Sequence, residues 1–283
     1  MTTVAATLAA ARKKLPASEA RLLLGHVLQR SPAWLIAHDD HPLDEDGLLA
    51  FASLVARRTA GEPIAYLLKN REFHGRAFEV SPAVLIPRPD TELLVDVVLQ
   101  EVMRSVTGGG KTKLLDLGTG SGCIAITLAL ECPEAEVTGV DRSNATLDVA
   151  KRNAMRLGAG VEFLRSDWFL ALANRRFDVI VGNPPYIAAN DPHLAQGDLR
   201  HEPPGALASG PDGLDAIRHI IAAAHGHLLP NGSLWLEHGY GQADTVAGLL
   251  AASGYTGIEQ HRDLAGILRV SGGRLAHGTD QRK

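Results

Sequence analysis

Apolar and polar positions divide the chain into a helical first part and a second part in which strands and helices alternate. In residues 45–60, Leu48, Phe51, Leu54 and Val55 recur at the spacing of one helix face. Residues that favour the start of a helix precede this segment and stand at the start of two earlier helical segments. The pattern predicts a bundle over residues 1–72 with helices at 3–15, 19–30, 32–36 and 45–60, started by Ser18, Pro32 and Asp44 and ended by Gly61.

A short alternating stretch connects the bundle to the rest of the chain. Its apolar residues are spaced as two short strands, so residues 73–92 are predicted to form a β-hairpin connector. The connector ends in a stiff Pro-Arg-Pro turn, after which Asp90 or Thr91 can cap a helix that runs to about residue 106. Arg88 in this turn can lie at the lip of a cleft or mark a simple elbow between domains, and the sequence leaves both open. The apolar positions are Phe73, Phe78, Val80, Val84 and Ile86, and the turn residues are Gly75, Ser81 and Pro82.

From residue 113 onward, short apolar runs alternate with helical segments. Each run is the length of a buried strand, and the alternation predicts an open α/β sheet whose ligands bind at the carboxyl ends of its strands. Strands are expected at 113–117, 136–140, 161–164, 177–181, 233–237, 255–260 and 267–270, helices at 123–130, 212–228 and 242–252, and a turn at 230–232.

Composition narrows the class of protein. A net charge of −4 and nearly equal numbers of basic and acidic residues in the bundle give no general footprint for nucleic acid. Cys123 and Cys132 form no ligand-spaced pair, and the histidines lack companions at metal spacing, so no metal is expected. No signal-peptide pattern or bilayer-length apolar run is present, and we expect a cytoplasmic protein.

A glycine-rich turn follows the strand at 113–117. Gly118, Thr119, Gly120, Ser121 and Gly122 lead directly into an apolar helix. Glycines let the backbone turn sharply and let a ligand approach without a Cβ clash. The spacing is G-x-G-x-G rather than the G-x-G-x-x-G of dinucleotide sites, so the turn predicts a nucleotide-containing ligand of another kind.

Two further strands of this series end in acidic residues. Asp141 can accept hydrogen bonds from both hydroxyls of a ribose, Asp167 can accept from an adenine amino group, and Trp168 can cover the ring. Either acid alone would more often be a helix cap or a turn residue. Their shared position after successive parallel strands favours an adenosine site.

The strand at 177–181 is followed by Asn183, Pro184, Pro185 and Tyr186. Two prolines force the chain out of the sheet and leave two acceptors, the Asn183 amide oxygen and the Pro184 carbonyl, for the hydrogens of a planar NH2 group. The Tyr186 ring can pack on the plane of that group. Taken alone, the segment could be a plain proline loop. Beside an adenosine site it favours methyl transfer from a sulfonium donor to nitrogen.

These motifs carry a family resemblance. The Asp116–Gly122 segment together with Asn183–Tyr186 resembles S-adenosylmethionine-dependent amino methyltransferases, and the match is closer to the bacterial release-factor glutamine methyltransferases, also called HemK-like. The resemblance spans almost the whole chain. It includes the helical bundle and the segments 71–73, 87–92, 191–194 and 200–203.

The resemblance implies a fold and a reaction. Residues 93–275 should form a seven-stranded Rossmann-like methyltransferase sheet that ends in an antiparallel hairpin. S-adenosyl-L-methionine is the implied cofactor and S-adenosyl-L-homocysteine its product. The implied acceptor is the glutamine of the Gly-Gly-Gln loop of class I peptide-chain release factors, which the bundle would bind. Asn183, Pro184 and Tyr186 would be catalytic.

Several expectations complete this interpretation. Residues 188–211 should form part of the substrate rim, and Glu237 and His238 should be structural rather than catalytic. We expect a monomer with no membrane contact and no direct contact with nucleic acid. The tail, residues 276–283, matches nothing in the family and is expected to be disordered.

Three other functions compete with this one. An adenine-N6 methyltransferase would use the same Asn-Pro-Pro-Tyr motif on a flipped base, but it predicts a basic face that the near-neutral bundle does not supply. A dinucleotide oxidoreductase is disfavoured by the glycine spacing. A non-enzymatic ribosome-associated module is disfavoured by the complete set of cleft motifs.

Overall fold

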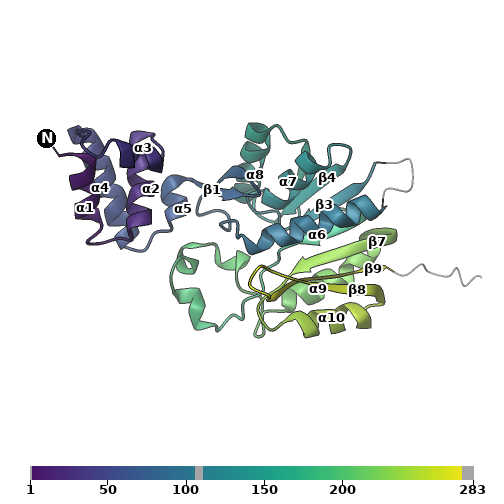
Figure 1. Cartoon of the computed structure of the whole chain (residues 1–283). Coiled ribbons are helices and arrows are strands. Elements are labelled where there is room, and N and C mark those ends of the chain that lie inside the picture. Colours follow the sequence, from purple (N-terminus) through teal and green to yellow (C-terminus); the bar gives the residue numbers. More distant parts are fainter. Residues whose placement is uncertain (1, 106–110, 276–283) are drawn as a thin grey trace, which may run out of the picture.

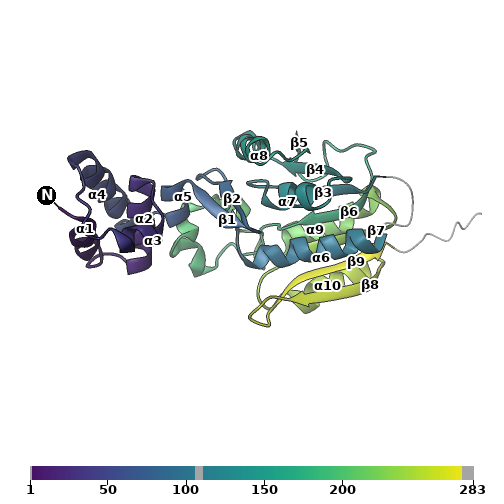
Figure 2. The ribbon, with the colours of Figure 1, turned by 45° about the horizontal axis from the view of Figure 1, so that its top comes forward.

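A small helical bundle and a larger α/β domain lie side by side along the molecule (Figure 1). The structure, a computed structural model, describes residues 2–105 and 111–275. The tail for which disorder is expected, residues 276–283, lies outside the described residues. Figure 2 shows the connector between the two parts, with the β1–β2 hairpin on the side facing the sheet.

The bundle owes its boundaries to local capping. Thr3, Ser31 and Asp44 each accept a hydrogen bond from a main-chain N–H in the first turn of the helix that follows. The prediction that Ser18 caps a helix is wrong, because that helix begins at Ala17, two residues earlier than expected and directly after Pro16, so Ser18 lies inside it. The helices are α1 (Val4–Ala11), α2 (Ala17–Leu28), α3 (Pro32–Ala37) and α4 (Glu45–Thr59).

The connector begins earlier than the sequence indicates. A short helix that was not predicted, α5 (Ile64–Leu68), is followed by β1 (Asn70–Phe73) and β2 (Arg76–Glu79). The hairpin thus starts inside the range assigned to the bundle. Phe73 and Phe78 are fully buried, with ring centroids 6.0 Å apart in an edge-to-face arrangement, and they join the main core.

One sheet organises the second domain, as predicted. In the described part of the chain it has seven strands in the order β5-β4-β3-β6-β7-β9-β8, with β5 to β7 parallel and the last two antiparallel. The strands are β3 (Lys113–Leu117), β4 (Glu136–Asp141), β5 (Val161–Arg165), β6 (Phe177–Gly182), β7 (Leu228–Glu237), β8 (Tyr255–Arg262) and β9 (Leu268–Leu275).

Both faces of the sheet are buried, because successive strand residues point to opposite sides. Leu114 packs with the helices on one face, and its neighbour Leu115 packs with those on the other. This explains why the strands read as continuous apolar runs. The first face is covered by α6 (Asp90–Ser105), α7 (Cys123–Glu131) and α8 (Asn144–Leu157), and the second by α9 (Asp215–Ala224) and α10 (Ala243–Ala252).

The predicted turn at 230–232 is wrong. Those residues lie inside β7, where pairing with β6 is interrupted between Phe177 and Val179 and Asn231 adopts a φ of 64°. The Pro-Asn-Gly sequence therefore makes an irregularity within a strand rather than a break. The helix expected from residue 212 begins instead at Asp215 and ends in a 3-10 turn, His225–His227.

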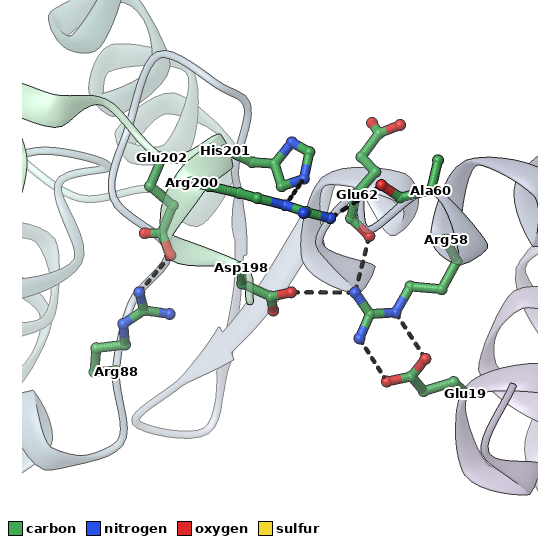
Figure 3. Close-up of polar contacts among 9 residues, drawn as sticks. All are labelled: Glu19, Arg58, Ala60, Glu62, Arg88, Asp198, Arg200, His201 and Glu202. Atoms are coloured by element: carbon green, nitrogen blue, oxygen red, sulfur yellow. Dashed lines mark hydrogen bonds and ion pairs between the residues drawn. The ribbon is translucent and has the colours of Figure 1, made fainter. Parts of the chain in front are cut away.

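The segment 188–211 links the two domains. It contains three 3-10 turns, Pro192–Ala195, Leu199–His201 and Pro204–Ala206. Arg200 donates to the carbonyl oxygen of Ala60 at 3.1 Å, at the end of α4 (Figure 3). The Glu202 carboxylate pairs with Arg88 and accepts from the Ile86 N–H, so the connector is held as well.

Arg58 of α4 forms an ion pair between the domains, with Asp198 of the segment 188–211. Its guanidinium binds both carboxylate oxygens of Glu19 at 2.7 and 2.9 Å, and it reaches Asp198 at 3.1 Å (Figure 3). The Arg58 and Glu19 side chains are only 19% and 20% exposed. The pair is therefore better shielded from water than an ordinary surface ion pair.

We expect Arg58→Met to lower the free energy of unfolding by roughly 1–3 kcal/mol, because it removes hydrogen bonds to two carboxylates. It should also speed proteolytic cleavage within residues 188–211. Arg57→Met is the matched control, since Arg57 pairs with Glu62 at the surface and should contribute about 0–1 kcal/mol. Urea unfolding and limited proteolysis measure both effects. If the two variants had the same stability and the same rate of proteolysis, Arg58 would not stabilise the contact between the domains.

Candidate active site

A cavity of about 460 Å³ lies at the carboxyl ends of the parallel strands. Its volume falls within the range of about 300–1,000 Å³ usual for small-molecule sites. The sequence-predicted residues that line it are Gly118, Gly120, Asp141, Asp167, Trp168, Asn183, Pro184 and Pro185.

The glycine turn contributes backbone rather than side chains to this cavity. Gly118 and Gly120 line it with φ values of 70° and 57°, which glycine adopts without strain. Thr119 and Ser121 are buried, and the Thr119 hydroxyl donates to Asp116 at 2.6 Å. Gly122 packs under the helix, where a Cβ would lie 2.8 Å from Ile126. A direct role for these last three loop residues in donor binding stays a prediction.

Asp141 is fixed at the cavity wall by main-chain donors. Its two carboxylate oxygens accept from the N–H groups of Gly120, at 3.3 Å, and Ser143, at 3.0 Å. Burial raises the pKa of Asp141, and these two N–H groups oppose the shift. A carboxylate held in this way can still accept from the hydroxyls of a ribose.

Trp168 forms a flat wall beside the glycine turn. A Cβ built on Gly118 would lie 3.7 Å from the Trp168 ring, so the indole is close to the turn. Trp168 has a φ of 48°, and its carbonyl oxygen accepts from the Ser166 hydroxyl at 2.7 Å. Asp167 is exposed at the rim. A glycine backbone, a carboxylate and an indole fit an adenosine group.

Asn183 lines the same cavity, and its amide is anchored from behind. Its Nδ2 donates to the Thr91 hydroxyl at 3.1 Å, which leaves the amide oxygen to accept from a ligand. Tyr186, by contrast, does not line the cavity. Its hydroxyl donates to Glu237 at 3.1 Å, and its ring packs against the core of the second sheet face. Its predicted contact with the acceptor stays a prediction.

The segment 188–211 contributes Pro203 and Ser209 to the rim, where the sequence placed the segment without naming residues, and other rim residues were not predicted. These others come from the connector, from the start of α8 and from α9. The length of the loop 188–211 was the signal for its part of the rim, and the residues from the connector, α8 and α9 gave no such signal. Arg88 pairs with Glu202 and does not line the cavity. The residues that were not predicted include Val84, Arg142, Thr146 and His219.

The described residues contain no cluster of metal-ligating side chains and no helix long and apolar enough to cross a bilayer.

The chain is similar to two family models, the PrmC N-terminal domain over residues 1–68 and the methyltransferase small domain over residues 90–210. It is 54% identical to a release factor glutamine methyltransferase of Bordetella pertussis, over 92% of this chain and 96% of that protein. It is 52% identical to one of Burkholderia pseudomallei, over 92% and 93%.

Among solved structures, the 16S rRNA N2 G1207 methyltransferase of T. thermophilus, in complex with AdoMet and guanosine, matches 73% of this chain and 49% of its own. The TM-score is 0.53 at 21% identity, so this likeness shows the fold alone.

The Rossmann-like sheet, the match to the methyltransferase small domain and the named relatives define an S-adenosylmethionine-dependent methyltransferase. Identity above 50% over nearly the full length of two curated relatives narrows the class. The chain belongs to the family of release factor glutamine methyltransferases.

We expect Asp141→Ala to weaken the binding of S-adenosylmethionine by roughly 1–3 kcal/mol, the contribution of hydrogen bonds to a charged group. Isothermal titration calorimetry measures the affinity. Asp148→Ala, at an exposed position on α8 outside the cavity, is the control and should bind normally. An unchanged affinity for Asp141→Ala would remove Asp141 from the donor site.

Proposed function

We propose that this protein methylates the side-chain amide nitrogen of the glutamine in the Gly-Gly-Gln loop of class I peptide-chain release factors. One observation carries the proposal. Asn183, with an amide oxygen available to accept, lines the same cavity as Gly118 and Gly120. The groups suited to an NH2 acceptor and those suited to the donor therefore share one space.

The chemical task explains why an amide side chain suits this position. A primary amide nitrogen is a poor nucleophile, because its lone pair is delocalised into the carbonyl. Hydrogen bonds from its two N–H groups to the Asn183 amide oxygen and the Pro184 carbonyl would fix its orientation and increase electron density on nitrogen. When bound, S-adenosylmethionine supplies a methyl group on a positively charged sulfur. The methylated amide can lose its extra proton to water, so no strong base is required.

The bundle supports a protein acceptor. Ile36 on α3 and Leu49 on α4 are 66% and 64% exposed, and Leu22 on α2 is 43% exposed. Apolar side chains displayed by neighbouring helices suit contact with another protein. The relatives named above are release factor methyltransferases, which supports the same partner. A monomer in the cytoplasm is the expected form.

We expect Asn183→Ala to abolish methyl transfer while leaving S-adenosylmethionine binding largely intact, because the side chain holds the acceptor rather than the donor. Labelled S-adenosylmethionine is supplied with a release factor, with its Gln→Ala loop variant, or with duplex DNA. Label should enter only the intact release factor. Asn174→Ala, at an exposed position near the amino ends of the parallel strands and away from the cavity, should behave as wild type.

Two outcomes would contradict this function, and a third would contradict the role of Asn183. Label in the Gln→Ala loop variant would place the methyl group elsewhere on the release factor. Label in DNA would favour an adenine-N6 methyltransferase. Normal turnover by Asn183→Ala would remove this residue from the acceptor site.

We expect Ile36→Asp to raise KM for the release factor at least about fivefold, since a buried charge at a protein interface costs more than 1 kcal/mol. The kcat and the affinity for S-adenosylmethionine should not change. Met155→Asp, at an 80% exposed position on α8, is the control. Steady-state kinetics with the release factor as the varied substrate measure the effect. Identical KM values for the two variants would exclude Ile36 from the docking surface.

A further inference from the structure

Two buried polar residues stand behind Asn183. Thr91 lies in the first turn of α6, and Glu237 is the last residue of β7. Each is only 1% exposed. Neither lines the cavity, so neither can touch a ligand directly. Buried polar side chains cost free energy unless they are paired, which makes their placement at this point of the site informative.

The hydrogen bonds connect these residues to the acceptor site. The Asn183 Nδ2 donates to the Thr91 hydroxyl at 3.1 Å. The Thr91 hydroxyl lies against the Glu237 carboxylate, and the Tyr186 hydroxyl donates to Glu237 Oε1 at 3.1 Å. Glu237 Oε2 is buried and has no hydrogen-bond partner among the described residues. The carboxylate is thus available to the hydroxyl proton of Thr91.

The order of donors and acceptors follows from the carboxylate. An ionised carboxylate can only accept, so the single hydroxyl proton of Thr91 is directed toward Glu237. The lone pairs of the Thr91 oxygen are then left to accept, and they can accept only from the NH2 side of the Asn183 amide. The amide oxygen must face the cavity. The reversed amide would present its NH2 group to the NH2 group of the acceptor.

We propose that Thr91 and Glu237 are positioning residues that hold the Asn183 carboxamide with its oxygen toward the cavity, which selects an NH2 group as acceptor. This inference rests on the proposed function, because it concerns the same nitrogen acceptor. Thr91 follows the proline turn at 87–89, and Tyr186 follows the prolines at 184–185. The main chain that carries these two residues is therefore stiff.

The charge on Glu237 controls the direction of the hydrogen bonds from Thr91 to Glu237 and from Asn183 to Thr91. The residues that face it are Tyr186, Asp90 of α6, Cys123 of α7 and Arg269 of β9. Burial raises the pKa of Glu237 to about 7, with a further increase from Asp90, while the hydroxyls and Arg269 oppose it. Above this pH the carboxylate only accepts. Below it the protonated acid can donate to Thr91, and the amide loses its fixed orientation. We therefore expect kcat to fall as pH falls through about 7.

Thr91→Val tests the hydroxyl, because valine has nearly the same shape. The variant should lower kcat at least about tenfold, the cost of leaving a buried hydrogen-bond group unpaired. The KM for the release factor and the affinity for S-adenosylmethionine should stay near wild type. Thr91→Ser restores the hydroxyl and should recover most of the rate. Thr127→Val removes another fully buried hydroxyl, on α7, and should leave kcat unchanged.

Glu237→Gln tests the charge. Glutamine can donate as well as accept, so kcat should fall and the pH profile should lose its limb near 7. If the limb persists in this variant, Glu237 does not control it. If Thr91→Val turns over as fast as wild type, or if Thr91→Ser is equally impaired, the hydroxyl does not position Asn183 and the inference is overturned.

A readout independent of the acceptor separates this inference from the proposed function. In ¹⁵N-labelled protein the Asn183 side-chain NH2 should exchange with solvent slowly in wild type and faster in Thr91→Val. Absence of methyl transfer by the wild-type enzyme would overturn the proposed function, while the exchange measurement would still test the amide's anchoring. Equal exchange rates in the two proteins would overturn the anchoring whatever the acceptor proves to be.

Discussion

The pairing of β3 with β6 is the constraint on which the site depends. The two parallel strands are hydrogen-bonded neighbours, with Leu117 opposite Gly182, so their carboxyl ends stop at the same level. The glycine turn leaves one strand and the Asn-Pro-Pro-Tyr segment leaves the other. Segments more than sixty positions apart in the sequence are thereby brought to one cavity. Gly182 itself permits the close pairing, because a Cβ there would lie 3.1 Å from the Leu117 carbonyl oxygen.

Desolvation gives the groups around this pairing their chemical character. Asp116 has its pKa raised to about 7 by complete burial, and the Thr119 hydroxyl and the Ala125 N–H hold one of its oxygens. Its place under the glycine turn makes the turn rigid from within. Glu237 takes the corresponding place under the Asn-Pro-Pro-Tyr segment. Each ligand-facing loop is thus supported by a buried acid that does not itself reach the cavity.

The segment 188–211 joins the second domain to the first. Asp198 and Arg200 of this segment bind the bundle, and Glu202 binds Arg88 of the connector (Figure 3). Burial raises the pKa of Glu202, and its pairing with Arg88 opposes the shift. The next residue, Pro203, lines the cavity. The bundle and the cavity wall are therefore mechanically connected through a few residues of one loop.

The sequence by itself determined the elements and the chemistry carried by local motifs. Apolar runs identified the parallel strands, Asp44 and Pro32 marked helix starts, and the motif residues Gly118 and Asn183 indicated a nitrogen methyltransferase, because these signals depend on near neighbours in the chain. Tertiary structure decided which side chains meet. It directed Tyr186 to Glu237 and placed Thr91 behind Asn183, and both are contacts between residues distant in sequence. Local pattern cannot specify such contacts, since they depend on strand order and on how helices pack across the sheet.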